Sequence, residues 1–212
     1  MTDPNKALIA VLLDRSGSME TIKADTEGGF NAFIDDQRKQ PGVAAVTLAQ
    51  FDTEYEVVYA NHPIADVGRL ELRPRGGTAL YDSLGRLITD VGAELSATPE
   101  DDRPGKVIVV VMTDGHENSS KEWSHEAVSK VIERQQRDYA WEFIFLGANM
   151  DAVAIGQQLG FAADRSMTYA TTAAGVSSSW QSNSALVSRM RAAPGRQRAE
   201  GYTADERRAA QR

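Results

Sequence analysis

Three short polar stretches of the sequence hold the side chains best suited to chemistry. They span residues 14–19 (DRSGSM), 76–78 (GGT) and 113–115 (TDG). Each stretch supplies carboxylate or hydroxyl oxygens, the chain has no cysteine, and no histidine lies within the three stretches. Oxygen donors alone select hard divalent cations such as Mg²⁺ or Mn²⁺. The candidate metal ligands are Asp14, Ser16, Ser18, Thr78 and Asp114.

The two aspartates create an electrostatic problem that a cation would solve. Carboxylates about 6 Å apart repel each other by roughly 3 kcal/mol at an effective dielectric constant near 20. A proton held at a raised pKa would offset that repulsion, and a divalent cation would offset it more completely. The alternation Asp-x-Ser-x-Ser lets the side chains of Asp14, Ser16 and Ser18 converge on one point, while Gly17 frees the turn.

The elements that must position these stretches alternate between strand and helix, which predicts an α/β sandwich. Continuously apolar runs are typical of strands buried on both faces, and they occur at 7–13 and 107–112. A third buried strand is expected at 142–147 (EFIFLG). The β-rich runs 43–51 and 55–59 are so close in sequence that they must pair antiparallel. A short last strand is expected at 165–169, and helices are expected at 19–38, 80–95, 122–137, 152–159 and 173–191.

This pattern predicts a doubly wound, Rossmann-like three-layer sandwich with a mostly parallel sheet, strand order 3-2-1-4-5-6 and one antiparallel edge strand. In such sheets a ligand binds beyond the carboxyl ends of the strands, where the strand order reverses. That point lies between the first strand, which ends at Asp14, and the fourth strand, which ends at Asp114. The two aspartates are therefore expected to meet there.

The three stretches, in this order and each at the end of a strand or the start of a helix, resemble the von Willebrand factor type A (vWA) domain. The resemblance covers roughly residues 5–190, and the run WEFIFLGANMDAVAIGQQL at 141–159 is similar to small bacterial and phage members. In that family the three elements form the metal-ion-dependent adhesion site. The resemblance thus implies an intracellular vWA domain with a metal site.

The resemblance also implies a role for each matching residue. Ser16 and Ser18 would coordinate the metal through their hydroxyls, and Thr78 would coordinate it when a ligand is bound. Asp14 and Asp114 would act mostly through water and hydrogen bonds. The remaining coordination position would accept an acidic side chain of a partner protein.

Simpler interpretations of the same residues stay open at this point. Ser16, Ser18 and Thr78 are also common helix caps, and Asp114-Gly115 is a common turn. Glu117 and Asn118 follow the third stretch and are expected in a solvated loop, with the rim of the site as the alternative. The spacing of His116 and His125 fits no zinc motif, so the three histidines, the third being His62, predict no zinc site.

Charge and composition narrow the class of partner. Of 212 residues, 23 are Lys or Arg and 30 are Asp or Glu, for a formal net charge of −7. Seven arginines and only three acidic residues fall between Arg189 and Arg212, so the rest of the chain is strongly acidic. An acidic body disfavours nucleic acid as a partner. No signal peptide or membrane span is apparent, so we expect a cytoplasmic protein that binds no membrane.

Two regions follow from these patterns: a vWA domain at 1–191 and an Arg-rich flexible tail at 192–212. The function expected is a Mg²⁺- or Mn²⁺-dependent protein-binding module without enzymatic activity. One alternative is a structural or assembly protein that uses the tail, with a metal that only stabilises the fold. Another is a metal-dependent phosphoester hydrolase, which is less favoured because the stretches supply no evident general base. The sequence does not indicate an oligomeric state.

Overall fold

The computed structural model describes residues 2–195 and 197–212. Residue 1 of the predicted domain and residue 196 of the predicted tail lie outside this part. The strands are β1 (Asp3–Asp14), β2 (Val43–Phe51), β3 (Tyr55–Pro63), β4 (Pro104–Thr113), β5 (Glu142–Ala148) and β6 (Ser166–Tyr169). The α-helices are α1 (Lys23–Arg38), α2 (Leu80–Ala97), α3 (His125–Tyr139), α4 (Ala152–Gln158), α5 (Ala173–Ala192) and α6 (Ala204–Ala210).

The six strands form one sheet in the order β3-β2-β1-β4-β5-β6. Neighbouring strands pair in parallel, apart from the antiparallel pair of β2 and β3. The predicted fold class, the strand order and the antiparallel edge strand are thereby confirmed. The carboxyl ends of β1 and β4 lie side by side at the point where the strand order reverses, with Leu13 opposite Met112.

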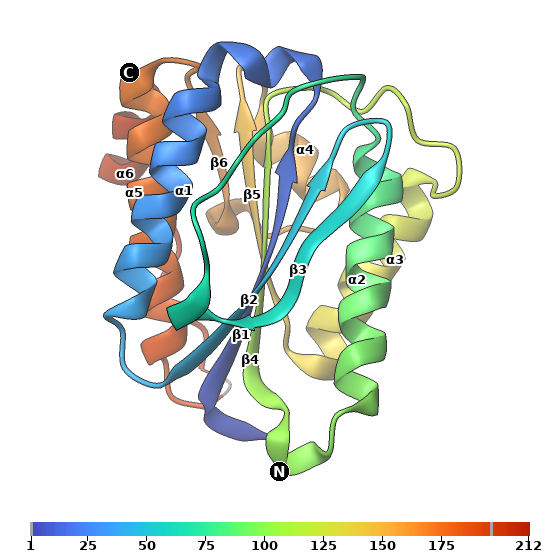
Figure 1. The fold of residues 1–212 in the computed structure, drawn as a ribbon, viewed down its shortest axis with the longest axis vertical. Coiled ribbons are helices and arrows are strands. Elements are labelled where there is room, and N and C mark those ends of the chain that lie inside the picture. The colour runs from blue at the N-terminus through green and yellow to red at the C-terminus, as the bar shows by residue number, and fades with distance from the viewer. Residues whose placement is uncertain (1, 196) are drawn as a thin grey trace.

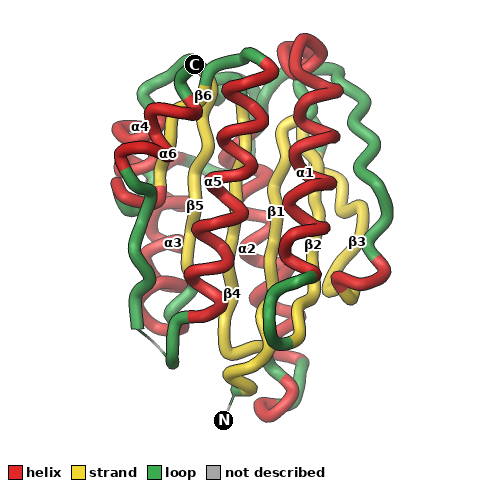
Figure 2. The backbone as a smooth tube through the Cα atoms, turned by 90° about the vertical axis from the view of Figure 1, so that its left-hand side faces the viewer, coloured by secondary structure: helices red, strands yellow, loops and turns green. Residues whose placement is uncertain are grey.

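Helices cover both faces of the sheet. Figure 1 shows α1, α5 and α6 on one side and α2 and α3 on the other, and Figure 2 shows α5 and α1 lying over the strands. The buried side chains of β1 alternate between the two layers: Ile9 and Val11 contact the first, whereas Leu8 and Leu12 contact the second. This two-sided burial explains why the run is continuously apolar.

A short 3₁₀ helix at Gly17–Ile22 leads into α1, which then continues through Gly28 and Gly29 without a break. The second glycine has a packing role. A Cβ atom built on Gly29 would lie 2.2 Å from Cδ1 of Trp180, which is buried in α5. The glycine therefore lets α1 and α5 approach closely. Packing of the Trp180 indole against Gly29 offsets the low helix propensity of this glycine.

The segment after α5 differs from the flexible tail expected at 192–212. The chain returns toward β6 and forms α6, which begins with a capping box between Thr203 and Glu206. Tyr202 and Ala210 are buried against the α5 side of the core. These apolar anchors are too few to stand out in an Arg- and Ala-rich sequence, yet they suffice to dock the segment on neighbouring elements.

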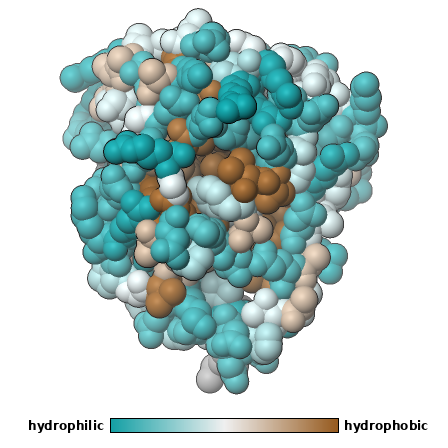
Figure 3. Space-filling model, viewed as in Figure 1, coloured by the Kyte–Doolittle hydropathy of each residue, from teal (hydrophilic) through white to brown (hydrophobic). Residues whose placement is uncertain are grey.

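The edge strand β3 is the most exposed strand of the sheet, and it crosses the face seen in Figure 1. That face is largely hydrophilic, with a group of hydrophobic side chains near its centre (Figure 3). Val57 and Val58 of β3 are 41% and 46% exposed. Within residues 2–195 and 197–212, no helix is both long and apolar enough to cross a membrane.

Candidate metal site

The first stretch leaves the end of β1, where Asp14 is completely buried. Both of its carboxylate oxygens accept short hydrogen bonds. The Ser16 backbone N–H donates to Oδ1 at 2.6 Å, and the Thr113 hydroxyl of β4 donates to Oδ2 at 2.6 Å. Asp14 therefore fixes the turn of the first stretch and ties the ends of β1 and β4 together.

The serine hydroxyls of the first stretch connect to the third stretch. Ser16 Oγ lies 3.1 Å from Ser18 Oγ, and Ser18 Oγ donates to Asp114 Oδ1 at 2.6 Å. Ser16 occupies the N-cap position of the 3₁₀ helix, but its side chain makes no capping hydrogen bond. The capping interpretation is therefore wrong for Ser16, whose hydroxyl instead faces the other oxygen donors.

Thr78 reaches the same place from the start of α2. Its loop is held against the first stretch by a hydrogen bond from the Gly17 N–H to the Gly76 carbonyl at 3.2 Å. A Cβ atom on Gly115 would lie 3.0 Å from Thr78 Oγ1 and 3.8 Å from Ser18 Oγ. The N-cap of α2 is Ala79, with no side-chain cap, so Thr78 does not cap this helix. Gly115 thus leaves a space beside the hydroxyls of the first and second stretches.

The loop after Asp114 holds the start of α2, a role that the sequence did not reveal. The Thr78 N–H donates to Asn118 Oδ1 at 2.9 Å, and the Tyr81 N–H donates to Glu117 Oε2 at 2.9 Å. Glu117 therefore satisfies an N–H group that the helix start leaves unpaired, and Asn118 fixes the residue just before the N-cap. The only sequence signal for this role was their position directly after the third stretch, where they were expected in a solvated loop.

The five predicted residues differ in exposure. Asp14, Ser16 and Thr78 are buried, Asp114 is half-buried, and Ser18 is exposed. The oxygens therefore line a site that is closed toward the sheet and open toward solvent on one side. Figure 1 shows the ends of β1 and β4 at the upper end of the sheet, below the loops that carry these residues.

The electrostatics of the site favour an added positive charge. Burial raises the pKa of Asp14 to about 6, against the hydrogen bonds from Thr113 and Ser16, and the nearby Asp114 adds to the increase. Burial also raises the pKa of Asp114, although the Ser18 hydrogen bond opposes it. The protein alone thus stabilises both carboxylates poorly as anions, and a bound cation would supply the missing stabilisation of their negative charge.

The donor set fits a hard divalent cation. It combines three hydroxyl oxygens with two carboxylates and holds no nitrogen or sulfur ligand, as Mg²⁺ and Mn²⁺ prefer. Among the described residues, no group of three or more His, Asp and Glu side chains is placed to hold a metal ion. The candidate site has only two such side chains, Asp14 and Asp114, so its remaining protein donors are hydroxyls.

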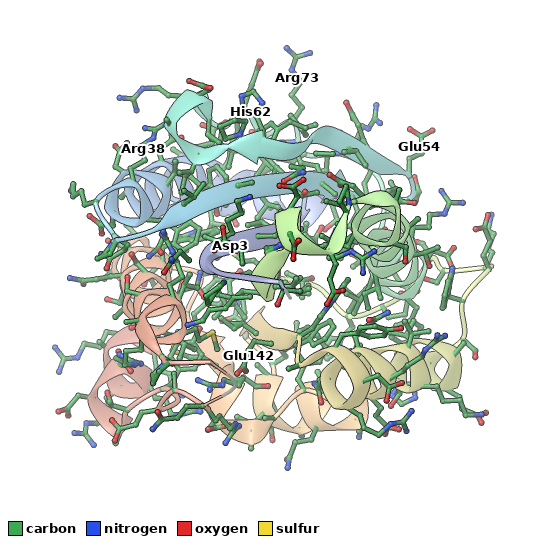
Figure 4. All side chains as sticks on the ribbon, turned by 90° about the horizontal axis from the view of Figure 1, so that it is seen from below. Asp3, Arg38, Glu54, His62, Arg73 and Glu142 are labelled. Atoms are coloured by element: carbon green, nitrogen blue, oxygen red, sulfur yellow. The ribbon has the colours of Figure 1, made fainter. Side chains whose placement is uncertain are left out.

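A pocket of about 840 Å³ lies at the opposite end of the molecule and shares no residue with the three stretches. Figure 4 looks at this end and labels Glu142, which lines the pocket. Two of its cations serve the fold. The half-buried Lys106 donates through Nζ to the Met190 and Arg191 carbonyls at 2.8 and 2.7 Å, and Nε of the buried Arg165 lies 3.6 Å from Glu142 Oε2. The candidate metal site and this pocket are separate features.

Comparison with known proteins supports the fold at low sequence identity. No family model matches the sequence, and no curated protein is significantly similar to it. Proximal thread matrix protein 1 from the mussel byssus is 14% identical with a TM-score of 0.61, over 86% of this chain and 46% of that one. A von Willebrand factor type A structure from Catenulispora acidiphila is 16% identical with a TM-score of 0.58, over 87% and 43% of the two chains.

A third solved structure, the pilus adhesin SpaC from Lactobacillus rhamnosus GG, is 14% identical with a TM-score of 0.60. It is matched over 87% of this chain and 31% of its own. One structure of the mussel protein has a zinc-occupied metal-ion-dependent adhesion site motif. The chain spans less than half the length of each of these solved chains. It has the fold of von Willebrand factor type A domains, as the motif resemblance predicted.

Proposed function

We propose that this chain is a metal-dependent protein-binding module. Asp14, Ser16, Ser18, Thr78 and Asp114 hold Mg²⁺ or Mn²⁺, and a carboxylate of a partner protein completes the coordination. The observation that carries the proposal is the oxygen cluster itself: side chains from three distant stretches meet at the end of the sheet, with Ser18 Oγ bonded to Asp114 Oδ1 at 2.6 Å. The known metal-ion-dependent adhesion site of the mussel protein is consistent with it.

The metal, when bound, supplies a positive charge that attracts the partner's carboxylate. The protein's own residues orient the hydroxyls and limit how much negative charge reaches the metal directly. Asp14 is already engaged by Ser16 and Thr113, and Asp114 is engaged by Ser18. Because both carboxylates accept hydrogen bonds within the site, we favour a binding role over hydrolysis, which needs a free base.

The alternative assembly role assigned the Arg-rich segment to a partner. In the structure, several of its arginines have partners within the chain: Arg198 pairs with Asp164 at 2.6 Å, and Arg207 Nη1 donates to the Ser166 carbonyl at 2.6 Å. These contacts favour a segment that completes the domain. We therefore place the partner-binding surface at the metal site.

The first test measures the binding of Mg²⁺ and Mn²⁺ by two methods, thermal melting and titration calorimetry. At a hundred times Kd the metal should add about 2.7 kcal/mol of stability. For a chain of this length that corresponds to a rise in Tm of about 5–10 °C. Thr78→Ala should weaken binding, whereas Thr89→Ala, which removes an exposed hydroxyl bonded to Gly85 on the same helix, should not. An unchanged Tm with both metals would contradict the proposal.

The second test addresses the partner. Proteins captured in Mg²⁺ should be released by EDTA and should not be captured by Thr78→Ala. Acidic residues of a captured partner would then be substituted one at a time, and one of these substitutions should abolish binding. If a partner is captured equally well in Mg²⁺ and in EDTA, it does not bind through the metal site.

A further inference from the structure

Asp52, in the turn between β2 and β3, has a side chain that is 1% exposed and is held between two arginines. Arg15 Nε donates to Asp52 Oδ2 at 2.8 Å, and Arg75 Nε donates to the same oxygen at 2.9 Å. The other oxygen, Oδ1, accepts the Glu54 N–H at 2.8 Å. A single buried carboxylate therefore anchors two cationic side chains and its own turn.

The two arginines belong to the two hydroxyl-bearing loops of the candidate metal site. Arg15 lies between Asp14 and Ser16 in the first stretch, and Arg75 is three residues before Thr78. The turn that carries Asp52 is thus connected by side-chain bonds to both loops, although it supplies no predicted metal ligand.

Backbone hydrogen bonds repeat the same connections. The Arg15 N–H donates to the Phe51 carbonyl at 2.7 Å, and the Arg75 N–H donates to the Arg15 carbonyl at 2.8 Å. The Ala79 N–H, at the start of α2, donates to the Asp52 carbonyl at 2.9 Å. The first stretch, the β2–β3 turn and the loop of Thr78 therefore form one connected unit around Asp52.

We propose that Asp52 is a positioning residue for the metal site, which sets the metal affinity by holding the first stretch and the Thr78 loop at a fixed separation. The inference rests on the proposed metal-binding function. It adds that the metal affinity depends on a residue outside the ligand set, through the negative charge of that residue's carboxylate.

The negative charge of the Asp52 carboxylate is the property that holds the two arginines in place. Burial alone would raise the pKa of Asp52, but hydrogen bonds from Arg75, from the Glu54 N–H and from Arg15 together lower it. Arg15 is itself only 7% exposed, so the loss of its partner would leave a buried cation with Glu56 as its remaining ion pair. A buried cation that loses a partner moves toward solvent or rearranges its loop. Here that loop carries Ser16 and Ser18.

The test is the affinity for Mn²⁺, measured by calorimetry on folded, metal-free protein well below its Tm. Asp52→Asn preserves the shape of the side chain and removes its charge. Loss of a direct partner of a metal ligand typically weakens metal binding by about 10–100-fold. Asp52 contacts residues close to the predicted ligands and not the ligands themselves, so we expect Kd to rise by about tenfold, at the lower end of that range. Glu54→Gln is the matched control: it removes the other carboxylate paired with Arg75, but its side chain is 73% exposed, and Figure 4 shows Glu54 at the periphery.

A double-mutant cycle separates positioning from general destabilisation. Arg75→Gln alone should weaken Mn²⁺ binding, and its side chain is 56% exposed, so this variant is expected to fold even where Asp52→Asn does not. Combining the two substitutions should weaken binding by less than the product of the single effects, because both act through one contact. Independent, multiplicative effects would overturn the inference.

The outcomes distinguish this inference from the proposed function. If the wild-type protein binds no Mn²⁺ or Mg²⁺, the metal-binding function itself fails. If the wild type binds Mn²⁺ and both Asp52→Asn and Arg75→Gln bind it equally well, only the positioning role fails. A weakened affinity in these two variants, with Glu54→Gln unchanged, supports both.

Discussion

Thr78 and Asn118 exchange two hydrogen bonds beside the candidate metal site. The Thr78 N–H donates to Asn118 Oδ1 at 2.9 Å, and the Asn118 N–H donates to the Thr78 carbonyl at 3.0 Å. The loop that follows Asp114 therefore sets the position of the threonine, in addition to the contacts around Asp52. A hydroxyl held in this way needs little reorganisation to bind a metal.

The first prediction concerns this pair. Asn118→Ala should leave the fold intact and raise the Kd for Mg²⁺ by about tenfold, since outer contacts of metal ligands have effects of that size. Calorimetry with Mg²⁺ measures the change. Asn5→Ala is the matched control, because Asn5 is exposed at the start of β1, at the other end of the sheet. Equal affinities for wild type and Asn118→Ala would show that Thr78 needs no such support.

The second prediction follows from the raised pKa of Asp14, about 6 against an ordinary value of 3.8. Without metal, the folded state binds this proton more tightly than the unfolded state does. The resulting stabilisation is complete below about pH 4 and is lost as the pH rises through about 6. A shift of this size corresponds to roughly 3 kcal/mol.

Asp14→Asn removes the titration and keeps the side chain's size. In EDTA at pH 7, the variant should therefore have a larger free energy of unfolding than the wild type, and the advantage should shrink toward pH 4. Urea denaturation at several pH values measures this difference. A difference that does not change with pH would show that Asp14 does not titrate in this range.

The third prediction uses two adjacent glycines of α1. A Cβ atom on Gly28 would meet nothing within 4 Å, whereas one on Gly29 would lie 2.2 Å from the Trp180 side chain. Gly28→Ala should stabilise the protein by about 0.5–1 kcal/mol through helix propensity. Gly29→Ala should destabilise it, by about 1–3 kcal/mol, through overpacking against α5. Thermal melting of the two variants side by side tests the contact, and similar effects would contradict it.

The fourth prediction concerns the docked C-terminal segment. Tyr202 is 7% exposed, its N–H donates to the Asp164 carbonyl at 2.9 Å, and it packs in the core on the α5 side. Tyr202→Ala should lower the free energy of unfolding by about 3 kcal/mol, as for other buried aromatic residues. The affinity for Mg²⁺ should be unchanged, because the segment contributes no ligand. An exposed residue of the same segment, Arg208, supplies the control Arg208→Ala. Equal stability of both variants would favour a flexible segment.

The sequence by itself determined the sheet, and it predicted the members of the candidate site. The runs 7–13 and 107–112 are continuously apolar because both faces of these strands are covered, and that pattern is visible locally. The motif order placed Asp14 and Asp114 at the ends of adjacent strands because parallel strands end at one edge. The structure brings both close to the hydroxyls of Ser16 and Ser18.

Helix α5 forms where a helix was expected, at 173–191, although its apolar pattern is weak. Gly175 and the serines at 177–179 interrupt that pattern. In the fold, Ser179, Ser182 and Ser184 are buried as well as Trp180, since the helix is packed between α1, α6 and the sheet. A helix covered on several sides has no polar stripe to give it a clear period, and small side chains allow its neighbours to approach.

Only the tertiary structure decided which residues support the site. Asp52 is 37 residues from Arg15, and Asn118 is 40 residues from Thr78, so neither pair forms a pattern that spacing reveals. Such contacts depend on strand register and on the path of loops between elements. The docking of Tyr202 and Ala210 has the same origin. A few apolar side chains in a charged segment form no recognisable local pattern, and their role is evident only from the surface on which they pack. Local periodicity thus specified the elements, and long-range packing specified how these elements hold the candidate metal ligands in place.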